Sequence, residues 1–483
     1  MAPTPPGPVW LLLRYYIWVP SFYVENFGCR ATQADGAAIE QQFLTRGLER
    51  ARALDEAEIV VLNTCTVTSA ADHDARAAIR RIHRENPQCQ IVVTGCYAQR
   101  APQEIAALPG VSKVIGNSHK HILSGLALPH PGIEESHLFG PCTVRRNDPS
   151  IIPLSTLSSS NPDVDRIFVS DIFAHTELMA APVFEAANER TRPNLKVQDG
   201  CDNRCSFCVI PAVRGHSRSL PPERVIREVK ALVASGYCEV VISGINLGRW
   251  GRDLSGQQRS RFVNLVYEIL QQTELEKLRI SSVEPMDWSD ELIALVAGSS
   301  RIAKHAHVPM QSASDRILRR MHRKYRPWHY REKIEKIRAA MPAAAIGADV
   351  MVGFPGETDE DFEATCRMVE SLPFTYLHVF TYSPRPGTPA AAMPHQVLPS
   401  VARERSRVLR ELAAQKKLAF MRSFLGKTIE AITLRFFDGH DTEAVTDNYL
   451  KLRIAGQHEA NRWVNARVDA CVDGGLLASL TQS

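Results

Sequence analysis

The sequence predicts an α/β protein of three folded units, the last of them all-β. At ~150 residues per domain, a chain of 483 residues corresponds to about three units. Strand-like and helix-like segments alternate over most of the chain, which is typical of parallel sheets covered by helices. After residue 426 the pattern changes to short strands separated by glycine-containing turns, which favours a small barrel.

The first unit is expected over residues 22–125, after an N-terminal extension of residues 1–21. Its buried strand candidates are β-branched and alternate with helical patterns, so we predict a doubly wound parallel sheet. The next stretch, 126–190, loses this rhythm and contains a Ser/Pro-rich run, which is typical of a linker. The three strand candidates of the first unit are 22–27, 59–63 and 91–94.

The second unit, 191–425, contains six further βα repeats and ends in a long basic helix after Pro399. Six repeats predict a partial (β/α)6 barrel related to the eight-repeat kind. The third unit, 426–483, is the small all-β barrel. The strand candidates of the second unit are 195–199, 239–243, 277–283, 304–308, 348–352 and 376–382.

Composition excludes several classes of protein. With 44% hydrophobic and 23% charged residues, the chain is neither disordered nor a multi-span membrane protein. The apolar run before residue 21 is interrupted by Arg14, is shorter than the ~20 residues that cross a bilayer and lacks a basic leader. We therefore expect a cytoplasmic protein that does not contact membranes. Its eleven cysteines are too sparse for a disulfide scaffold.

The clearest chemical motif is QDGCDNRCSFCVIPAVRG, which holds Cys201, Cys205 and Cys208 in C-x3-C-x2-C spacing. Three thiolates in one loop supply three of the four protein ligands that an iron–sulfur cube usually takes, and they leave one iron open. The motif follows the first barrel strand, on the catalytic face of such barrels. A structural zinc loop is the alternative, although no fourth ligand stands at zinc-finger spacing.

A second cysteine set is spread through the first unit. Cys29, Cys65 and Cys96 each follow a strand candidate. The carboxyl ends of parallel strands meet at one edge of a sheet, so these thiols are expected to converge on a second cluster. Three ordinary buried cysteines are the alternative. The other cysteines show no ligand spacing and are expected to be buried thiols: Cys89, Cys142, Cys238, Cys366 and Cys471.

With these motifs the chain resembles the methylthiotransferase family of radical S-adenosylmethionine (SAM) enzymes from about residue 22 to its C-terminus. The resemblance implies a methylthiotransferase domain, a radical SAM barrel and an RNA-binding barrel of the TRAM type. The further segments that carry it are SGINLGRWG (243–251), RISSVEP (279–285), HVPMQSASDRILRRMHRKY (307–325), VGFPGET (352–358) and VFTYSPRPGTPA (379–390).

Within the family, NTCTVT (63–68) and QDGCDN (198–203) are similar to enzymes that act on N6-threonylcarbamoyladenosine in tRNA. The branch that acts on N6-isopentenyladenosine usually carries an Arg soon after its equivalent of Cys65, where this chain has Val67. That branch is the nearest alternative, and a ribosomal-protein methylthiotransferase is a more distant one. Thr32 departs from the Asn that is usual in the family.

The resemblance implies two [4Fe-4S] clusters and SAM. The cluster on Cys201, Cys205 and Cys208 would bind SAM at its open iron and yield a 5′-deoxyadenosyl radical, which removes hydrogen from C2 of the adenine. The cluster on Cys29 and its two partners would supply the sulfur, and a second SAM the methyl group. An electron donor of the flavodoxin or ferredoxin type is implied, whereas the sulfur donor stays unidentified.

Further residues are candidates for SAM contacts. Gly244 would let the backbone approach the cofactor closely, and Ser282 and Glu284 follow the third barrel strand. A plain turn, or a polar cluster at the barrel end, is the alternative. Gln311 and Arg323 belong to the fourth βα loop. Thr358 is expected only to cap a helix.

Two basic stretches suggest an RNA partner, which the resemblance identifies as the tRNA anticodon stem-loop. Residues 301–340 carry a net charge of +9, and residues 401–430 a net charge of +5. Such stripes bind phosphates, although a solvated helix face is the alternative. Tyr449 and Trp463 are candidates for base stacking. We expect a monomer, and the competing class is a non-catalytic iron–sulfur or zinc RNA-binding protein.

Overall fold

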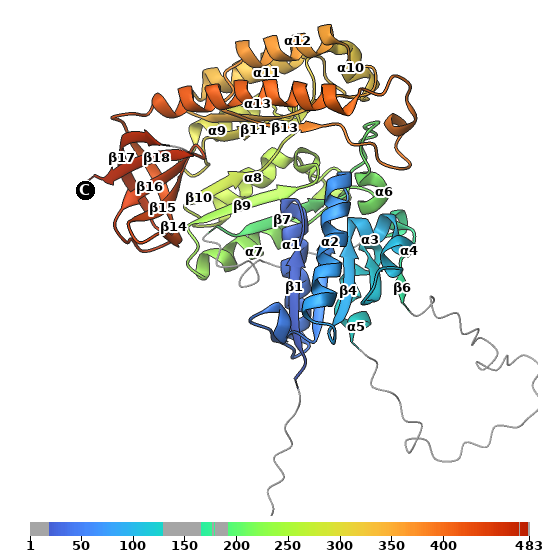
Figure 1. The fold of residues 1–483 in the computed structure, drawn as a ribbon. Coiled ribbons are helices and arrows are strands. Elements are labelled where there is room, and N and C mark those ends of the chain that lie inside the picture. The colour runs from blue at the N-terminus through green and yellow to red at the C-terminus, as the bar shows by residue number, and fades with distance from the viewer. Residues whose placement is uncertain (1–18, 129–165, 176–177, 179–191, 473, 482–483) are drawn as a thin grey trace, which may run out of the picture.

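The computed structural model describes residues 19–128, 166–175, 178, 192–472 and 474–481. It confirms the predicted fold class: a parallel sheet with helices on both faces, a partial βα barrel and a closed β-barrel at the C-terminus (Figure 1). Residues 1–18 of the predicted N-terminal extension (1–21) and most of the predicted linker lie outside the described residues. No described helix is long and apolar enough to cross a bilayer.

The first unit is a six-stranded sheet in the order β2-β1-β3-β4-β5-β6. Side chains alternate across β3, so that Val60 and Leu62 pack under one layer of helices and Val61 under the other. The strands are β1 (Ser21–Asn26), β2 (Glu49–Arg50), β3 (Ile59–Thr64), β4 (Gln90–Gly95), β5 (Val111–Gly116) and β6 (Ile167–Phe168). The helices are α1 (Arg30–Thr45) and α5 (Leu123–Ala127) on one face and α2 (Ser69–Glu85), α3 (Cys96–Arg100) and α4 (Pro102–Ala106) on the other.

The edge strand β6 comes from the stretch that the sequence predicts as a linker. Ile167 pairs with Val114 of β5, so part of 126–190 completes the first sheet. Strand pairing of only two residues is invisible to sequence periodicity, which needs several alternating positions.

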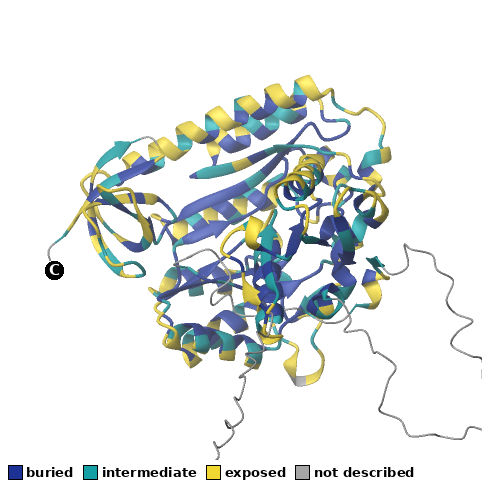
Figure 2. Ribbon diagram, turned by 60° about the horizontal axis from the view of Figure 1, so that its bottom comes forward, coloured by how far each residue is buried: buried dark blue, intermediate teal, exposed yellow. Residues whose placement is uncertain are grey.

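The second unit contains the six predicted parallel strands, arranged as two sheets that meet where Leu278 bridges Ile302. Figure 2 shows most of these strands buried, whereas β13 is half-buried, and the helices expose their outer faces. The strands are β7 (Asn194–Asp199), β9 (Glu239–Gly244), β10 (Lys277–Ile280), β11 (His305–His307), β12 (Ala345–Val352) and β13 (Tyr376–Thr381), with a short antiparallel β8 (Arg218–Ser219). The helices are α6 (Ile210–Arg214), α7 (Pro222–Ala234), α8 (Phe262–Gln272), α9 (Asp290–Gly298), α10 (Asp315–Arg320), α11 (Pro327–Ala340) and α12 (Asp359–Ser371).

Local sequence signals set several of these boundaries. Thr358 accepts a hydrogen bond from the backbone of Asp361, whose carboxylate in turn accepts one from the backbone of Thr358. This capping box starts α12 as the sequence predicts. Helix α13 (Pro399–Arg422) packs along β13 and leads to the C-terminal barrel (Figure 1).

The C-terminal barrel closes in the order β14-β15-β16-β18-β17. It docks on the start of β9 and β10, where Arg279 is fully buried and pairs with Glu239 at 2.6 Å. The same guanidinium donates to the carbonyls of Thr446 and Asp447 at 3.2 and 3.0 Å. The strands are β14 (Thr428–Phe437), β15 (Asp441–Thr446), β16 (Lys451–Ala455), β17 (Trp463–Val472) and β18 (Gly475–Leu480).

Removing Glu239 should therefore destabilise this junction. The substitution Glu239→Ala leaves the buried Arg279 charge without its carboxylate, which typically costs about 3–5 kcal/mol of unfolding free energy. Chemical denaturation followed by circular dichroism measures the loss. Glu411→Ala, on the exposed face of α13, is the control and should leave the denaturation midpoint unchanged. A Glu239→Ala protein as stable as the control would contradict this account of the junction.

Candidate active site

One cavity of about 620 Å³ connects the units at the carboxyl ends of the barrel strands. Cys29 lines it from the first unit, and Cys201, Cys205 and Cys208 line it from the second. All the candidate contact residues predicted from the sequence also line it: Gly244, Ser282, Glu284, Gln311 and Arg323. Residues predicted from separate sequence motifs to be functional therefore line the same cavity.

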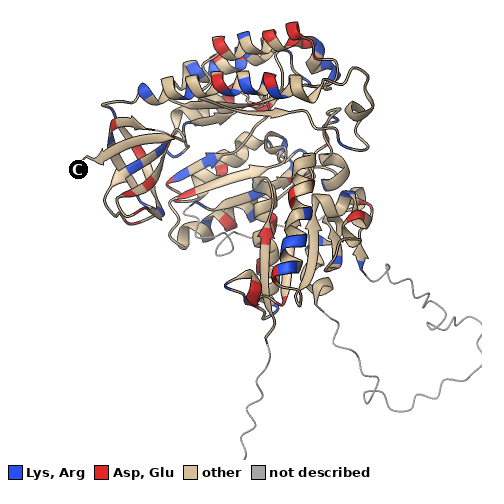
Figure 3. Ribbon diagram, in the orientation of Figure 1, with Lys and Arg blue, Asp and Glu red and all other residues tan. Residues whose placement is uncertain are grey.

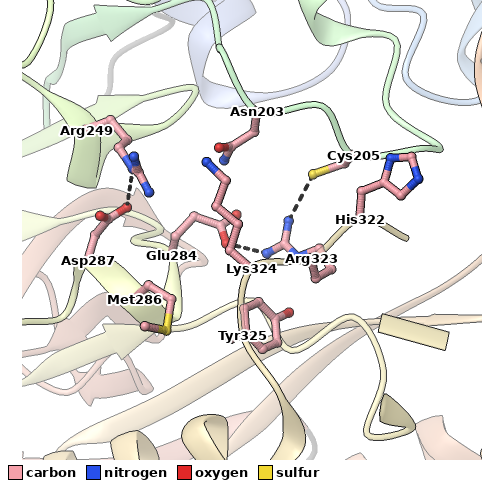
Figure 4. A pocket seen from close by; sticks show the side chains of 10 residues that line it. All are labelled: Asn203, Cys205, Arg249, Glu284, Met286, Asp287, His322, Arg323, Lys324 and Tyr325. Atoms are coloured by element: carbon pink, nitrogen blue, oxygen red, sulfur yellow. Dashed lines mark hydrogen bonds and ion pairs between the residues drawn. The ribbon is translucent and has the colours of Figure 1, made fainter. Parts of the chain in front are cut away.

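The loop of Cys201, Cys205 and Cys208 is surrounded by hydrogen-bond donors. Asn246 donates its amide to the sulfur of Cys201 at 3.5 Å. Figure 4 shows Arg323 donating to the sulfur of Cys205, at 3.4 Å. Burial raises the pKa of the Cys208 thiol to about 12, although a backbone hydrogen bond from Ile210 acts in the opposite direction. Donors aimed at sulfur stabilise thiolates and tune the clusters they hold.

The cysteines of the first unit follow three strands that are neighbours in the sheet, β1, β3 and β4. Cys65 and Cys96 are buried, whereas Cys29 is exposed on the cavity side. A Cβ on Gly28, whose φ is +102°, would lie 3.0 Å from the Cys65 sulfur, so only glycine lets the two loops approach so closely. Burial first, and then the neighbouring Cys96, raises the pKa of the Cys65 thiol to about 12.

Two of these thiols also have a polar side chain beside them. The Thr32 hydroxyl lies 3.6 Å from the Cys29 sulfur, so the residue that departs from the family pattern still contacts this cysteine. Asn117 donates its amide toward the Cys96 sulfur at 3.6 Å and to the carbonyl of Val213 in the second unit at 2.7 Å.

A buried network of five charges joins the two cysteine regions. Asp35 of α1 contacts Lys120, Lys196 and Arg214, at 3.0 Å for Lys120 and for Arg214. Asp199, which stands two residues before Cys201, contacts Lys196 at 2.8 Å and Arg214 at 2.9 Å. Burial alone would raise the pKa of Asp35, but Lys120, Lys196 and Arg214 outweigh it and hold this pKa well below its usual range.

The candidate SAM contacts form a second, smaller charged group. Arg323 pairs with Glu284 as well as with Cys205 (Figure 4). Burial raises the pKa of Glu284 against the lowering effect of Arg323. A Cβ on Gly244 would lie 2.9 Å from the side-chain oxygen of Gln198, so packing against Gln198 requires this glycine.

The donor set fits the iron–sulfur cluster and SAM that the motifs imply. The clearest sign is a set of buried polar atoms without a hydrogen-bond partner in the described part of the chain: Asn246 Oδ1, Gln311 Oε1 and Arg323 Nε. These residues line or border the cysteine loop, and a bound polar ligand would satisfy them. Among the described residues, no three His, Cys, Asp or Glu side chains already converge on a single metal ion. Cluster ligation by the cysteines therefore stays a prediction.

Several site residues were missed by sequence reasoning. Asn117 directly follows β5, so the strand-end rule that found the cysteines also applies to it. Lys120, Lys196 and Arg214 had no such signal, because partners distant in the chain decide which lysines and arginines become buried.

The cations of the basic stretch 301–340, predicted to bind phosphates, also make contacts within the protein. Most of them are engaged in this way: Arg316 pairs with Asp361, and Lys304 donates to the carbonyls of Ala297 and Ser299. Figure 3 shows acidic residues alternating with basic ones along the outer helices. The net charge of one segment of the sequence does not include the acidic residues from other segments that lie beside it in the fold.

The two aromatic residues expected to stack on RNA face the second unit. The Tyr449 ring lies 4.9 Å from that of His305, and Lys277 lies 4.8 Å from the centre of the Trp463 ring. The exposed aromatic residues among the described part of the barrel are instead Phe436 and Phe437, which are 58% and 36% exposed.

The remaining described cysteines fit the prediction only in part. Cys238 is buried as expected, but Cys89, Cys366 and Cys471 are only half-buried. Cys142 lies outside the described residues.

Comparisons with known proteins match this division of the chain. The profile of the radical SAM superfamily matches residues 195–369, and that of the uncharacterized protein family UPF0004 matches residues 21–116. A threonylcarbamoyladenosine tRNA methylthiotransferase MtaB of Bacillus subtilis is 36% identical over 90% of this chain and 90% of its own length. The chain belongs to the radical SAM methylthiotransferase family.

Other relatives agree with the family assignment, and one solved structure shares the fold. The MtaB of Aquifex aeolicus is 33% identical over 92% of this chain and 99% of its own. A tRNA-2-methylthio-N(6)-dimethylallyladenosine synthase of Acidothermus cellulolyticus is 31% identical over 96% of this chain and 86% of its own. The radical SAM methyltransferase TsrM of Kitasatospora setae shares the fold, with a TM-score of 0.52 at 17% identity over 77% of this chain and 73% of its own. Family membership implies SAM and one [4Fe-4S] cluster.

The buried charge network predicts a pH dependence of stability in the cofactor-free methylthiotransferase. Because the pKa of Asp35 is lowered on folding, its contribution is present at pH 7 and is lost as the pH falls below about 4. Asp35→Asn should lose about 3 kcal/mol at pH 7 and show a flatter profile in acid. Urea unfolding at several pH values measures both effects.

Asp74→Asn, an exposed substitution on α2, is the control and should keep the wild-type profile. If Asp35→Asn also kept it, the network would not hold the units together as described.

Proposed function

We propose that this protein is a tRNA methylthiotransferase that inserts sulfur and a methyl group at C2 of N6-threonylcarbamoyladenosine next to the anticodon. The observation that carries the proposal is that Cys29 of the first matched unit and all three cysteines of the second line one cavity. The first relatives carry the name threonylcarbamoyladenosine tRNA methylthiotransferase. Dimethylallyladenosine synthases follow at lower identity and give the second candidate substrate.

In this proposal Cys201, Cys205 and Cys208 hold a [4Fe-4S] cluster. When bound, the cluster and SAM supply the electron and the 5′-deoxyadenosyl radical that removes hydrogen from C2 of the adenine. The chain's own residues hold these groups and orient them. Arg323 donates to the Cys205 sulfur and offsets the charge of the half-buried Glu284, and Asn246 orients Cys201.

We propose further that Cys29, Cys65 and Cys96 hold a second cluster. Arg214 and Lys120 place positive charge near these thiolates, since both interact electrostatically with Cys96. Neighbouring cations stabilise thiolates, and the buried position of Cys65 and Cys96 keeps water away. We expect the protein to be a monomer in the cytoplasm. We also expect an electron donor of the flavodoxin or ferredoxin type to reduce its clusters.

The two trios should separate in a mutational test of the reaction. Cys205→Ala should abolish formation of 5′-deoxyadenosine. Cys65→Ala should retain that cleavage but lose methylthiolation, because only the second cluster is affected. Mass spectrometry of the reaction mixture measures 5′-deoxyadenosine, and mass spectrometry of the nucleosides from a threonylcarbamoylated anticodon stem-loop measures methylthiolation. Cys366→Ala, a cysteine outside both trios, should behave like the wild type. Full methylthiolation by the Cys65→Ala protein would contradict the proposed role of the second cluster in methylthiolation.

Iron content gives an independent test. After anaerobic reconstitution the wild type should bind about eight iron atoms per chain, and Cys65→Ala about four, because each cube holds four irons. Colorimetric iron and sulfide analysis of the same samples measures these values. About four irons in the wild type would contradict the second cluster but leave the first in place.

A further inference from the structure

We propose that four side chains on the inner face of the partial barrel, with one from the C-terminal barrel, bind the polar substituent on N6 of the target adenosine. These residues, called the lumen wall, all line the cavity that contains the cysteines: His305, His307, Tyr376, His378 and Tyr449. The inference rests on the proposed function, because it assigns the part of the protein that distinguishes threonylcarbamoyl from other substituents.

Strand register brings four of these residues together. His307 of β11 pairs with Gly347 of β12, which pairs with Tyr376 of β13. Since side chains alternate along a strand, His305 shares the inner face with His307, and His378 shares it with Tyr376. A Cβ on Gly347 would lie 1.9 Å from Cζ of Tyr376, so this glycine makes room for the ring.

The rings of the wall are ordered by their mutual contacts. The Tyr376 hydroxyl and His305 Nε2 are 2.7 Å apart. The Tyr376 ring also stacks with those of His305 and His307, at 5.9 Å between centres in both cases. The wall therefore presents ring nitrogens and a phenol group in fixed positions.

Tyr449 extends the wall from the C-terminal barrel. It lies between β15 and β16 with φ of +67°, a left-handed conformation that is uncommon for a residue with a side chain. The Tyr449 ring lies 6.3 Å from that of Tyr376, and the Arg279 guanidinium lies 5.3 Å from the centre of the Tyr449 ring. The unit proposed to bind RNA thus contributes directly to the substrate cavity, and strained backbone of this kind clusters at binding sites.

Unsatisfied polar atoms indicate that this part of the cavity takes a polar ligand. Nε2 of His307 and Oε1 of Gln311 have no hydrogen-bond partner among the described residues, at 9% and 7% exposure of their residues. His307 Nε2 lies 3.3 Å from Asp349 Oδ1, within ion-pair distance but without hydrogen-bond geometry. Glu284 and Arg323 are the other charged groups that line the cavity.

A threonylcarbamoyl group suits this lining by its chemistry. It carries a urea, a hydroxyl and a carboxylate, whereas an isopentenyl group is wholly apolar. Imidazole and phenol groups donate and accept hydrogen bonds to the first kind of substituent. An apolar substituent would leave buried polar atoms unpaired, which is the strongest basis for rejecting a ligand.

The test measures RNA binding by the full-length protein without cofactors, so that it does not depend on the reaction. Fluorescence anisotropy compares two anticodon stem-loops that differ only in carrying N6-threonylcarbamoyladenosine or plain adenosine. The wild type should bind the modified RNA about 5- to 20-fold more tightly. His378→Ala, at an exposed position of the wall, and Tyr376→Phe, which removes one hydroxyl, should reduce this ratio to about one-third or less.

His329→Ala, at an exposed histidine on the outer helix α11, is the matched control and should keep the full ratio. Both wall variants should bind the unmodified RNA as the wild type does. If the reconstituted wild type methylthiolates threonylcarbamoyladenosine but both wall variants keep its binding preference, the wall is wrong and the proposed function stands. If the wild type neither prefers nor modifies the threonylcarbamoylated RNA, the proposed function and this inference both fail.

Discussion

The buried contact between Asp35 and the cations Lys120, Lys196 and Arg214 is the constraint on which the rest of the site depends. Asp35 and Lys120 come from the first unit, and the other two from the second. Charges buried this deeply are stable only when every one is paired. Because hydrogen bonds between ions are directional, the network permits one relative placement of the two units.

This placement determines where the thiols lie. Asp35 stands in α1, which begins directly after Cys29, and Asp199 stands two residues before Cys201. Asn117 reinforces the junction by contacting Cys96 in its own unit and the carbonyl of Val213 in the other. Polar contacts made within a few residues of each cysteine region therefore hold both regions beside one cavity. The C-terminal barrel lines the same cavity through Tyr449.

The sequence predicts most of this architecture because its signals are local. Strand ends, cysteine spacing and the cap at Thr358 each depend on a few neighbouring residues, and the six barrel strands lie where hydrophobic runs place them. What it misses depends on contacts between distant segments. Arg214 and Lys120 look like surface residues, the cations of 301–340 pair with acids from elsewhere, and Tyr449 turns inward at the seam between two units.

The central claim is that two clusters are held across one cavity by the two cysteine trios. Electron paramagnetic resonance of the anaerobically reduced protein tests it most directly, because two paramagnetic clusters at the same cavity couple magnetically. We expect the wild-type spectrum to show broadening and fast relaxation from this coupling, and the spectrum of Cys65→Ala to show one uncoupled cluster. A wild-type spectrum identical to that of Cys65→Ala would contradict the account.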